Sequence, residues 1–129
     1  RPVEFPRVDE RVVSKRHRYG YSSTFGDDAI DDADFPDAGL LKYDVETGAS
    51  QFRSFGKGSG AAEGVFIPRA DDAAEDDGWV MAVVYVPERD GSDLVLLDAQ
   101  DFTGEPVARV HLPQRVPFGF HGNWVPDGQ

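Results

Sequence analysis

The sequence contains no cysteine, and this excludes a disulfide framework, a thiolate metal site and a cysteine nucleophile. A metal would have to be held by histidine, aspartate or glutamate, and the chain has only three histidines. No apolar run approaches the roughly 20 residues of a transmembrane helix, and the opening stretch RPVEFPRVDE lacks the apolar core of a signal peptide. We therefore predict a cytoplasmic protein with no transmembrane segment.

Basic residues are also scarce, with 13 Lys and Arg against 24 Asp and Glu and a formal net charge of −11. A nucleic-acid partner is excluded, because phosphate binding needs a basic face that releases counterions. The 129 residues, 40% of them hydrophobic, are enough for one domain that buries roughly two-thirds of its unfolded surface. The chain has no initiator Met and ends in the strand-like WVPDGQ, so we predict a fragment of a longer protein.

Helical periodicity is absent, whereas short runs rich in Val, Tyr, Phe and Leu alternate with Gly, Pro and Asp. The pattern predicts an all-β chain with two hairpins, one turning at residues 44–48 and one at residues 90–91. Two acidic clusters, at residues 26–37 and 69–78, are expected to be solvated loops. The predicted strands are 18–24, 39–44, 50–55, 64–68, 78–87, 92–98, 106–112 and 119–125.

The chain also repeats itself at a spacing of about 60 residues. EFPR (residues 4–7) recurs as EGVFIPR (residues 63–69), and each copy continues into a Gly-aromatic strand and then a strand that ends in Asp. A four-strand unit of this length is typical of a β-propeller blade. We predict one blade at about residues 1–60, a second at about 61–117, and the inner strand of a closing blade at 118–129.

A third copy of the repeat start is found near the carboxyl end, where HGNWVP (residues 121–126) aligns with EGVFIP. Glu4, Glu63 and His121 then begin three successive units. Because the first strand of each blade lines the propeller axis, these side chains are expected to converge there. A histidine with carboxylates and no cysteine favours a metal centre with imidazole ligands. The competing interpretation is that a lone histidine and strand-start glutamates are merely structural or exposed.

Four segments together resemble the carboxyl-terminal portion of the carotenoid cleavage oxygenases, which include lignostilbene dioxygenases and retinal-pigment-epithelium isomerases. They are VEFPRVDERVVSKRHRYGY, EGVFIPRADDAAEDDGWVMAVVY, SDLVLLDAQDF and PVARVHLPQRVPFGFHGNW. The resemblance is weakest at residues 26–36. It implies a seven-bladed propeller whose axial non-haem Fe(II), held by four histidines, uses O2 to cleave a conjugated double bond. The substrate would be a carotenoid, an apocarotenoid or a stilbene, and the products two carbonyl compounds.

The resemblance makes His121 the last iron ligand and Glu4 and Glu63 outer carboxylates. We expect Glu63 to support His121 and Glu4 to support a histidine outside this chain. His17 and His111 match no ligand and are expected to be structural or exposed. One ligand cannot hold iron, so the chain alone is predicted to be inactive and to need the rest of the propeller as its partner. The family often has Pro where this chain has Gly64.

Two further interpretations remain. A stand-alone β-sheet module could bind a partner without chemistry, although two blades leave exposed edges that would need oligomerisation. A calcium site in the acidic cluster at residues 27–39 lacks the EF-hand order of ligands. Phe118 and Phe120 flank His121, and strand alternation predicts that both pack between blades.

Overall fold

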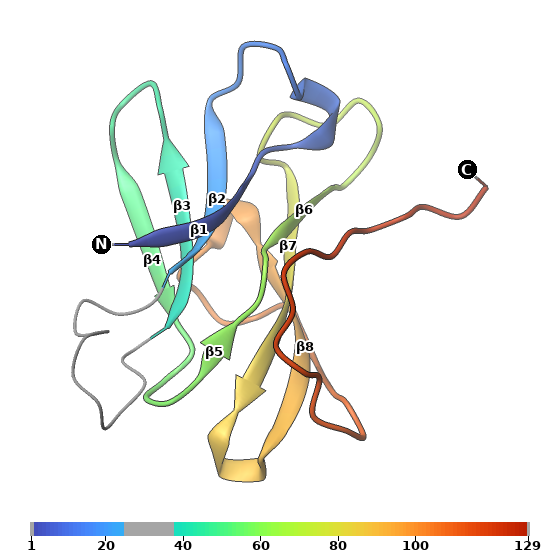
Figure 1. Cartoon of the computed structure of the whole chain (residues 1–129). Helices are drawn as coiled ribbons and strands as arrows, with labels where there is room; N and C mark the ends of the chain where they lie inside the picture. Colours follow the sequence, from blue (N-terminus) through green and yellow to red (C-terminus); the bar gives the residue numbers. More distant parts are fainter. Residues whose placement is uncertain (1, 25–37, 129) are drawn as a thin grey trace.

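Two antiparallel sheets make up the computed structural model, which describes residues 2–24 and 38–128 (Figure 1). The prediction of an all-β chain is confirmed, because the only helices among these residues are three single 3-10 turns, at Glu10–Val12, Pro87–Arg89 and Ala99–Asp101. None of these turns could cross a membrane. The strands are β1 Val3–Arg7, β2 Tyr19–Thr24, β3 Gly39–Asp44, β4 Ser50–Ser54, β5 Gly60–Ala61, β6 Val65–Pro68, β7 Gly78–Val86, β8 Gly91–Asp98 and β9 Ala108–His111.

The first sheet has the order β1-β2-β3-β4, and its predicted β3–β4 hairpin is confirmed. Asp44 closes the turn, since its carboxylate accepts the backbone N–H groups of Glu46 at 3.0 Å and Thr47 at 3.4 Å. Gly48 has a φ of 74°, a conformation that glycine adopts without a steric penalty. The sequence signal for this turn was local, which explains why the prediction succeeded.

The second sheet is centred on β7, with β8 and then β9 on one side and both β5 and β6 on the other. The β7–β8 hairpin turns at the predicted place, with Asp90 in the left-handed conformation directly before Gly91. Burial alternates along β7, where Val80, Ala82 and Val84 face the core. This period of two is the reason the strand could be predicted from its sequence.

The core lies between the two sheets. Tyr21 from β2 stacks on Phe66 from β6 with ring centroids 5.8 Å apart, and Leu40 from β3 belongs to the same buried cluster. Each fully buried side chain of this size contributes roughly 1.5–3 kcal/mol relative to its exposed state. Face-to-face packing of the sheets therefore places β1 near the connection between β5 and β6, and these two segments carry the candidate site.

A β-bulge interrupts β1, and another lies between β5 and β6. Residues 62–64 lie opposite only two residues of β7, so the strand interrupted between β5 and β6 has one extra residue. In β1, Phe5 and Pro6 lie opposite one residue of β2, and Phe5 has a φ of 54°. Bulges of this kind re-aim side chains. Glu63 lies inside one bulge and Glu4 directly precedes the other.

The second acidic cluster is more than a solvated loop, which corrects the prediction for residues 69–78. Glu75 accepts the backbone N–H groups of Arg18 at 2.7 Å and Tyr19 at 2.8 Å. Asp76 forms an ion pair of 2.9 Å with Lys42, whose ammonium group is buried. These carboxylates join the two sheets, and only the fold brings their partners near. All of the first acidic cluster, and residues 27–37 of the candidate calcium motif, lie outside the described residues.

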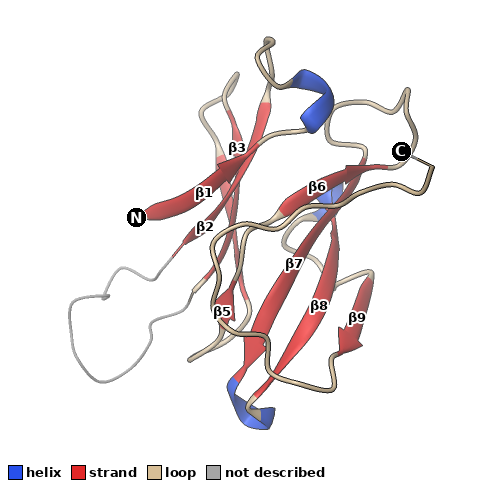
Figure 2. Cartoon of the chain, turned by 45° about the vertical axis from the view of Figure 1, so that its right-hand side comes forward, coloured by secondary structure: helices blue, strands red, loops and turns tan. Residues whose placement is uncertain are grey.

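The predicted strand at residues 119–125 is not formed, because none of the described residues after β9 belongs to a strand. A strand forms only where its backbone groups pair with a neighbour, and no strand of the described residues pairs with this segment. The C-terminal segment, residues 112–128, instead runs back along β6 as an extended chain (Figure 2). Leu112 and Val116 anchor its first part by donating their N–H groups to the carbonyl and hydroxyl oxygens of Ser92, each at 2.9 Å.

Candidate metal centre

The bulge between β5 and β6 places Glu63 against the C-terminal segment. Its carboxylate is almost fully buried, with 3% of the side chain exposed. The Gly122 N–H donates to Oε2 at 2.8 Å, and His121 Nδ1 lies 3.4 Å from Oε1. The shorter contact is the stronger bond, so Glu63 holds this segment chiefly through the backbone next to His121. Two residues that are 58 positions apart in the sequence thus form one cluster.

The chemistry of the carboxylate decides which nitrogen of His121 carries the hydrogen. An ionised carboxylate can only accept, so Nδ1 is the donor, and in the neutral imidazole Nε2 then keeps its lone pair. The imidazole side chain is 74% exposed. A histidine whose Nδ1 hydrogen is bonded to a carboxylate while Nε2 is accessible has the usual arrangement of a metal-ligating imidazole.

Arg7, at the end of β1, completes the cluster. Its Nη1 lies 3.1 Å from Glu63 Oε1 and donates to the Gly122 carbonyl oxygen at 3.0 Å. Its Nη2 donates to Asn123 Oδ1 at 3.1 Å and to Glu10 at 2.6 Å. Sequence reasoning assigned no role to Arg7, although its place in the repeated motif was a usable signal.

The surroundings keep Glu63 ionised. Burial favours the neutral acid, but the Gly122 N–H, the Arg7 guanidinium and His121 outweigh burial and lower the pKa of Glu63. Burial likewise opposes the charge of Arg7, yet the carboxylates of Glu63 and Glu10 raise the pKa of that guanidinium. Glu63 therefore presents an ionised carboxylate behind the imidazole.

Aromatic side chains border the imidazole on the side of the first sheet. The Phe5 ring meets His121 edge to face with centroids 5.4 Å apart, and it meets Phe120 at 6.5 Å. Phe118 instead lies over the second sheet, 6.3 Å from the Tyr85 ring. The two phenylalanines thus contact different sheets, because the segment that carries them does not alternate as a strand.

The structure does not bring the third predicted residue into this cluster. Glu4 pairs with Ser23 through its backbone, but its side chain is exposed and forms no hydrogen bond or ion pair with the other described residues. His17 is half-buried in the loop before β2, with Nδ1 3.3 Å from the Lys15 carbonyl oxygen. His111, on the edge strand β9, contacts Asp93 and not Glu63. Glu63 and His121 are the predicted pair that the fold assembles.

The residues present fit part of a metal site. Nowhere in residues 2–24 and 38–128 do three or more His, Asp or Glu side chains form a group that could hold an ion. His121 supplies one imidazole with an accessible Nε2, and Glu63 supplies the carboxylate behind it. This donor set suits a borderline metal such as iron as one ligand among several.

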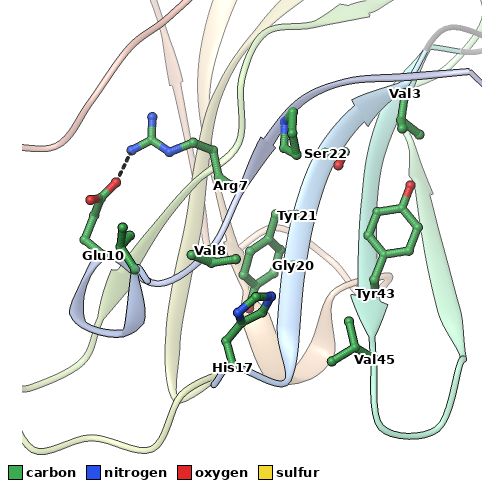
Figure 3. Close-up of a pocket in the computed structure, with 12 residues that line it drawn as sticks. Val3, Arg7, Val8, Glu10, His17, Gly20, Tyr21, Ser22, Tyr43 and Val45 are labelled. Carbon is green, nitrogen blue, oxygen red and sulfur yellow. Dashed lines mark hydrogen bonds and ion pairs between the residues drawn. The ribbon is translucent and has the colours of Figure 1, made fainter. Parts of the chain in front are cut away.

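Two pockets differ in their relation to this cluster. The larger, of about 660 Å³, lies on the first sheet and is lined mainly by apolar residues, with the Arg7–Glu10 ion pair at its edge (Figure 3). It contains neither Glu63 nor His121. The smaller, of about 230 Å³, is bounded by β7 and the C-terminal segment and is lined by both of these residues. The smaller pocket is therefore the candidate site, because it contains both Glu63 and His121.

The fold and the cluster define an all-β chain that presents an imidazole backed by a buried carboxylate. The family described as Retinal pigment epithelial membrane protein matches residues 1–126. The chain belongs to this family, the carotenoid cleavage oxygenases.

Two relatives illustrate the match. The carotenoid cleavage oxygenase of Mycobacterium tuberculosis is 44% identical over 132 residues, covering 98% of this chain and 25% of that protein. The apocarotenoid-15,15'-oxygenase of Synechocystis sp. is 37% identical over 125 residues, covering 97% of this chain and 25% of that protein. The chain thus spans about a quarter of the length of the curated relatives it matches.

Solved structures agree with the sequence comparison. The lignostilbene dioxygenase of Pseudomonas brassicacearum superposes with a TM-score of 0.85 at 32% identity, covering 97% of this chain and 27% of that one. Cobalt-substituted apocarotenoid oxygenase of Synechocystis superposes with a TM-score of 0.83 at 36% identity, covering 95% of this chain and 25% of that one. The neighbours are propeller oxygenases, which confirms the predicted fold class, and the cobalt-bound form identifies the family as metalloenzymes.

Proposed function

We propose that this chain is the carboxyl-terminal part of a non-haem Fe(II) dioxygenase. The complete enzyme would cleave a conjugated carbon–carbon double bond of a carotenoid, apocarotenoid or stilbene with O2, giving two carbonyl products. The relatives support this class, since their names are those of carotenoid, apocarotenoid and lignostilbene oxygenases. The observation that carries the proposal is the contact between buried Glu63 and His121 across 58 residues of sequence.

In this proposal Nε2 of His121 is one iron ligand, and the remaining ligands come from the rest of the protein. Bound iron would supply the activation of O2. Glu63 accepts the Nδ1 hydrogen, and this fixes the tautomer and raises the basicity of the imidazole. Glu4 directly precedes the bulge of β1, the neighbouring inner strand, and would support a histidine outside this chain.

The blade assignment belongs to the same proposal. The first sheet, β1 to β4, would be one blade and the second, β5 to β9, the next, with residues 118–129 as the inner strand of a closing blade. The closing blade would then supply the strand partner that residues 119–125 lack. A chain with one ligand cannot hold iron, so these 129 residues alone would be inactive. The cytoplasmic location stays a prediction from the sequence.

The test is the iron content of the full-length protein in two histidine variants. We expect His121→Ala to abolish stoichiometric iron and turnover, whereas His17→Ala keeps both, because the hydrogen bond of the His17 imidazole is to the backbone carbonyl group of Lys15 and not to Glu63. Equal iron in the wild type and His121→Ala would contradict the proposal. A full-length protein that folds but binds no iron would instead favour a non-catalytic β-sheet module.

A further inference from the structure

The Arg7 guanidinium contacts both partners of the hydrogen bond between Glu63 and Gly122, the residue next to His121. Nη1 lies between the Glu63 carboxylate and the Gly122 carbonyl oxygen, while the Gly122 N–H itself donates to Glu63. Arg7, Glu63 and Gly122 thus form a closed triangle of interactions. Nη2 adds a bond to Asn123, the next residue along the segment.

Arginine is the side chain that suits this position. The two Nη groups carry four hydrogens in a planar fork, and they face four acceptors, on Glu63, Gly122, Asn123 and Glu10. Lysine would present three hydrogens from one point and could not reach both ends of this arrangement. The Arg7 side chain is 17% exposed, so little water is available to replace a lost bond.

The C-terminal segment needs such a restraint, because the described residues provide no strand ladder for residues 119–125. A metal ligand has to be held within about 0.5 Å of its working position by groups that lock its surroundings. Glu63 and Arg7 are the side chains that bond the backbone of Gly122, next to His121.

We propose that Arg7 is a positioning residue for His121, acting through the Glu63 carboxylate and through the backbone of Gly122 and Asn123. The inference rests on the proposed function in so far as His121 binds a metal. It adds that the strand motif EFPR contributes its arginine, from the neighbouring sheet, to the geometry of that ligand. Arg7 touches neither the imidazole nor a metal in this role.

The experiment compares four variants of the full-length protein: Arg7→Gln, Arg7→Lys, Arg69→Gln and His121→Ala. Arg69 is the matched control, because it occupies the repeated position in FIPR but bonds Asp77 and stacks on Trp79 instead. Two quantities are measured: cobalt(II) affinity, by chelator competition together with the visible absorption of the bound ion, and amide hydrogen exchange of residues 119–125 in metal-free protein.

We expect Arg7→Gln to weaken cobalt binding about 10-fold, the lower end of the loss seen for groups behind a metal ligand, and to change the cobalt absorption. Exchange at residues 119–125 should rise about 10-fold. Arg7→Lys should recover part of both, since its charge can still face Glu63. Arg69→Gln should match the wild type. These results together would support the proposal.

Wild-type affinity, absorption and exchange in Arg7→Gln would overturn the inference. Equal losses in Arg69→Gln would also overturn it, because they would indicate general destabilisation. If Arg7→Gln does not fold, Arg7→Lys and a fifth variant, Asn123→Ala, decide, and wild-type values in both would count against the role. Wild-type cobalt affinity in His121→Ala would refute the proposed function, while the exchange of the metal-free protein would still test whether Arg7 holds the segment.

Discussion

Two buried carboxylates in this chain have nearly the same set of partners. Glu63 is bonded to an arginine and a histidine, and so is Asp93, whose side chain is 1% exposed. His111 Nδ1 lies 2.7 Å from Asp93, whereas His121 Nδ1 lies 3.4 Å from Glu63. The histidines are similarly exposed, at 65% and 74%. By distance alone, the Asp93 cluster is the better imidazole–carboxylate pair.

The difference lies in what each carboxylate connects. Asp93 on β8 binds Arg89 and Arg109 as well as His111, all within 18 residues of sequence, so it fastens the edge strand β9 to its neighbour. Glu63 joins β1 and the C-terminal segment across more than 50 residues. Two guanidinium groups already face Asp93, and its histidine lies at the sheet edge. A close histidine–carboxylate contact is therefore insufficient evidence of a site.

The test with the largest expected effect replaces each of the two histidines with alanine. In the full-length protein we expect His121→Ala to lower metal affinity more than 100-fold, because a ligand is lost, and His111→Ala to leave it unchanged. Equilibrium dialysis against cobalt(II) measures both. Equal metal binding by the two variants would remove the distinction between the clusters.

The second test replaces each of the two carboxylates with the corresponding amide. Glu63→Gln should reduce metal affinity and turnover about 10 to 100-fold without unfolding the protein, because the amide accepts more weakly from His121 and Gly122. Asp93→Asn serves as the matched control and should keep wild-type turnover. Unchanged turnover in Glu63→Gln would argue against its role behind the ligand.

The third test measures how strongly Asp93 stabilises the edge strand β9. Asp93→Asn leaves Arg89, Arg109 and His111 without their shared anion. Breaking a buried pair costs about 3–5 kcal/mol, and the partial exposure of these arginines reduces this to about 2 kcal/mol. Amide exchange in β9 should then accelerate about 30-fold, with no change at residues 119–125. A uniform acceleration over both regions would contradict a local role.

The smallest effect is the contribution of the Asp93 cluster to the pH dependence of stability. Burial alone would raise the pKa of Asp93, but His111, Arg109 and Arg89 lower it from its ordinary value of 3.8. The ionised form thus contributes stability above that value and loses it as the pH falls through the lowered pKa. Thermal unfolding should show a shallower acid slope in Asp93→Asn. An identical slope in the wild type would exclude this contribution.

The features that the sequence predicts correctly are those that short-range interactions determine. The β3–β4 and β7–β8 hairpins were predictable because their turns and alternating side chains are local signals. The contact between Glu63 and His121 is long-range, and it could be predicted because the repeat and the family resemblance both place these residues at equivalent positions of neighbouring units. The strand predicted at residues 119–125 is not formed, because their apolar pattern favours a strand but does not supply a neighbour to pair with.

By itself, the sequence determined the all-β class, the positions of most strands and the residue types available for a metal. These depend on side-chain alternation, turn chemistry and the absence of cysteine, all of which act within a few residues. Only the tertiary structure decided that Arg7 bridges Glu63 and Gly122, that Glu75 and Asp76 join the sheets, and that Asp93 fastens β9. These contacts join residues that lie apart in the sequence and become neighbours only when the chain folds. The strength of an ion pair depends on the distance between the two charges, and a local sequence pattern does not contain that distance.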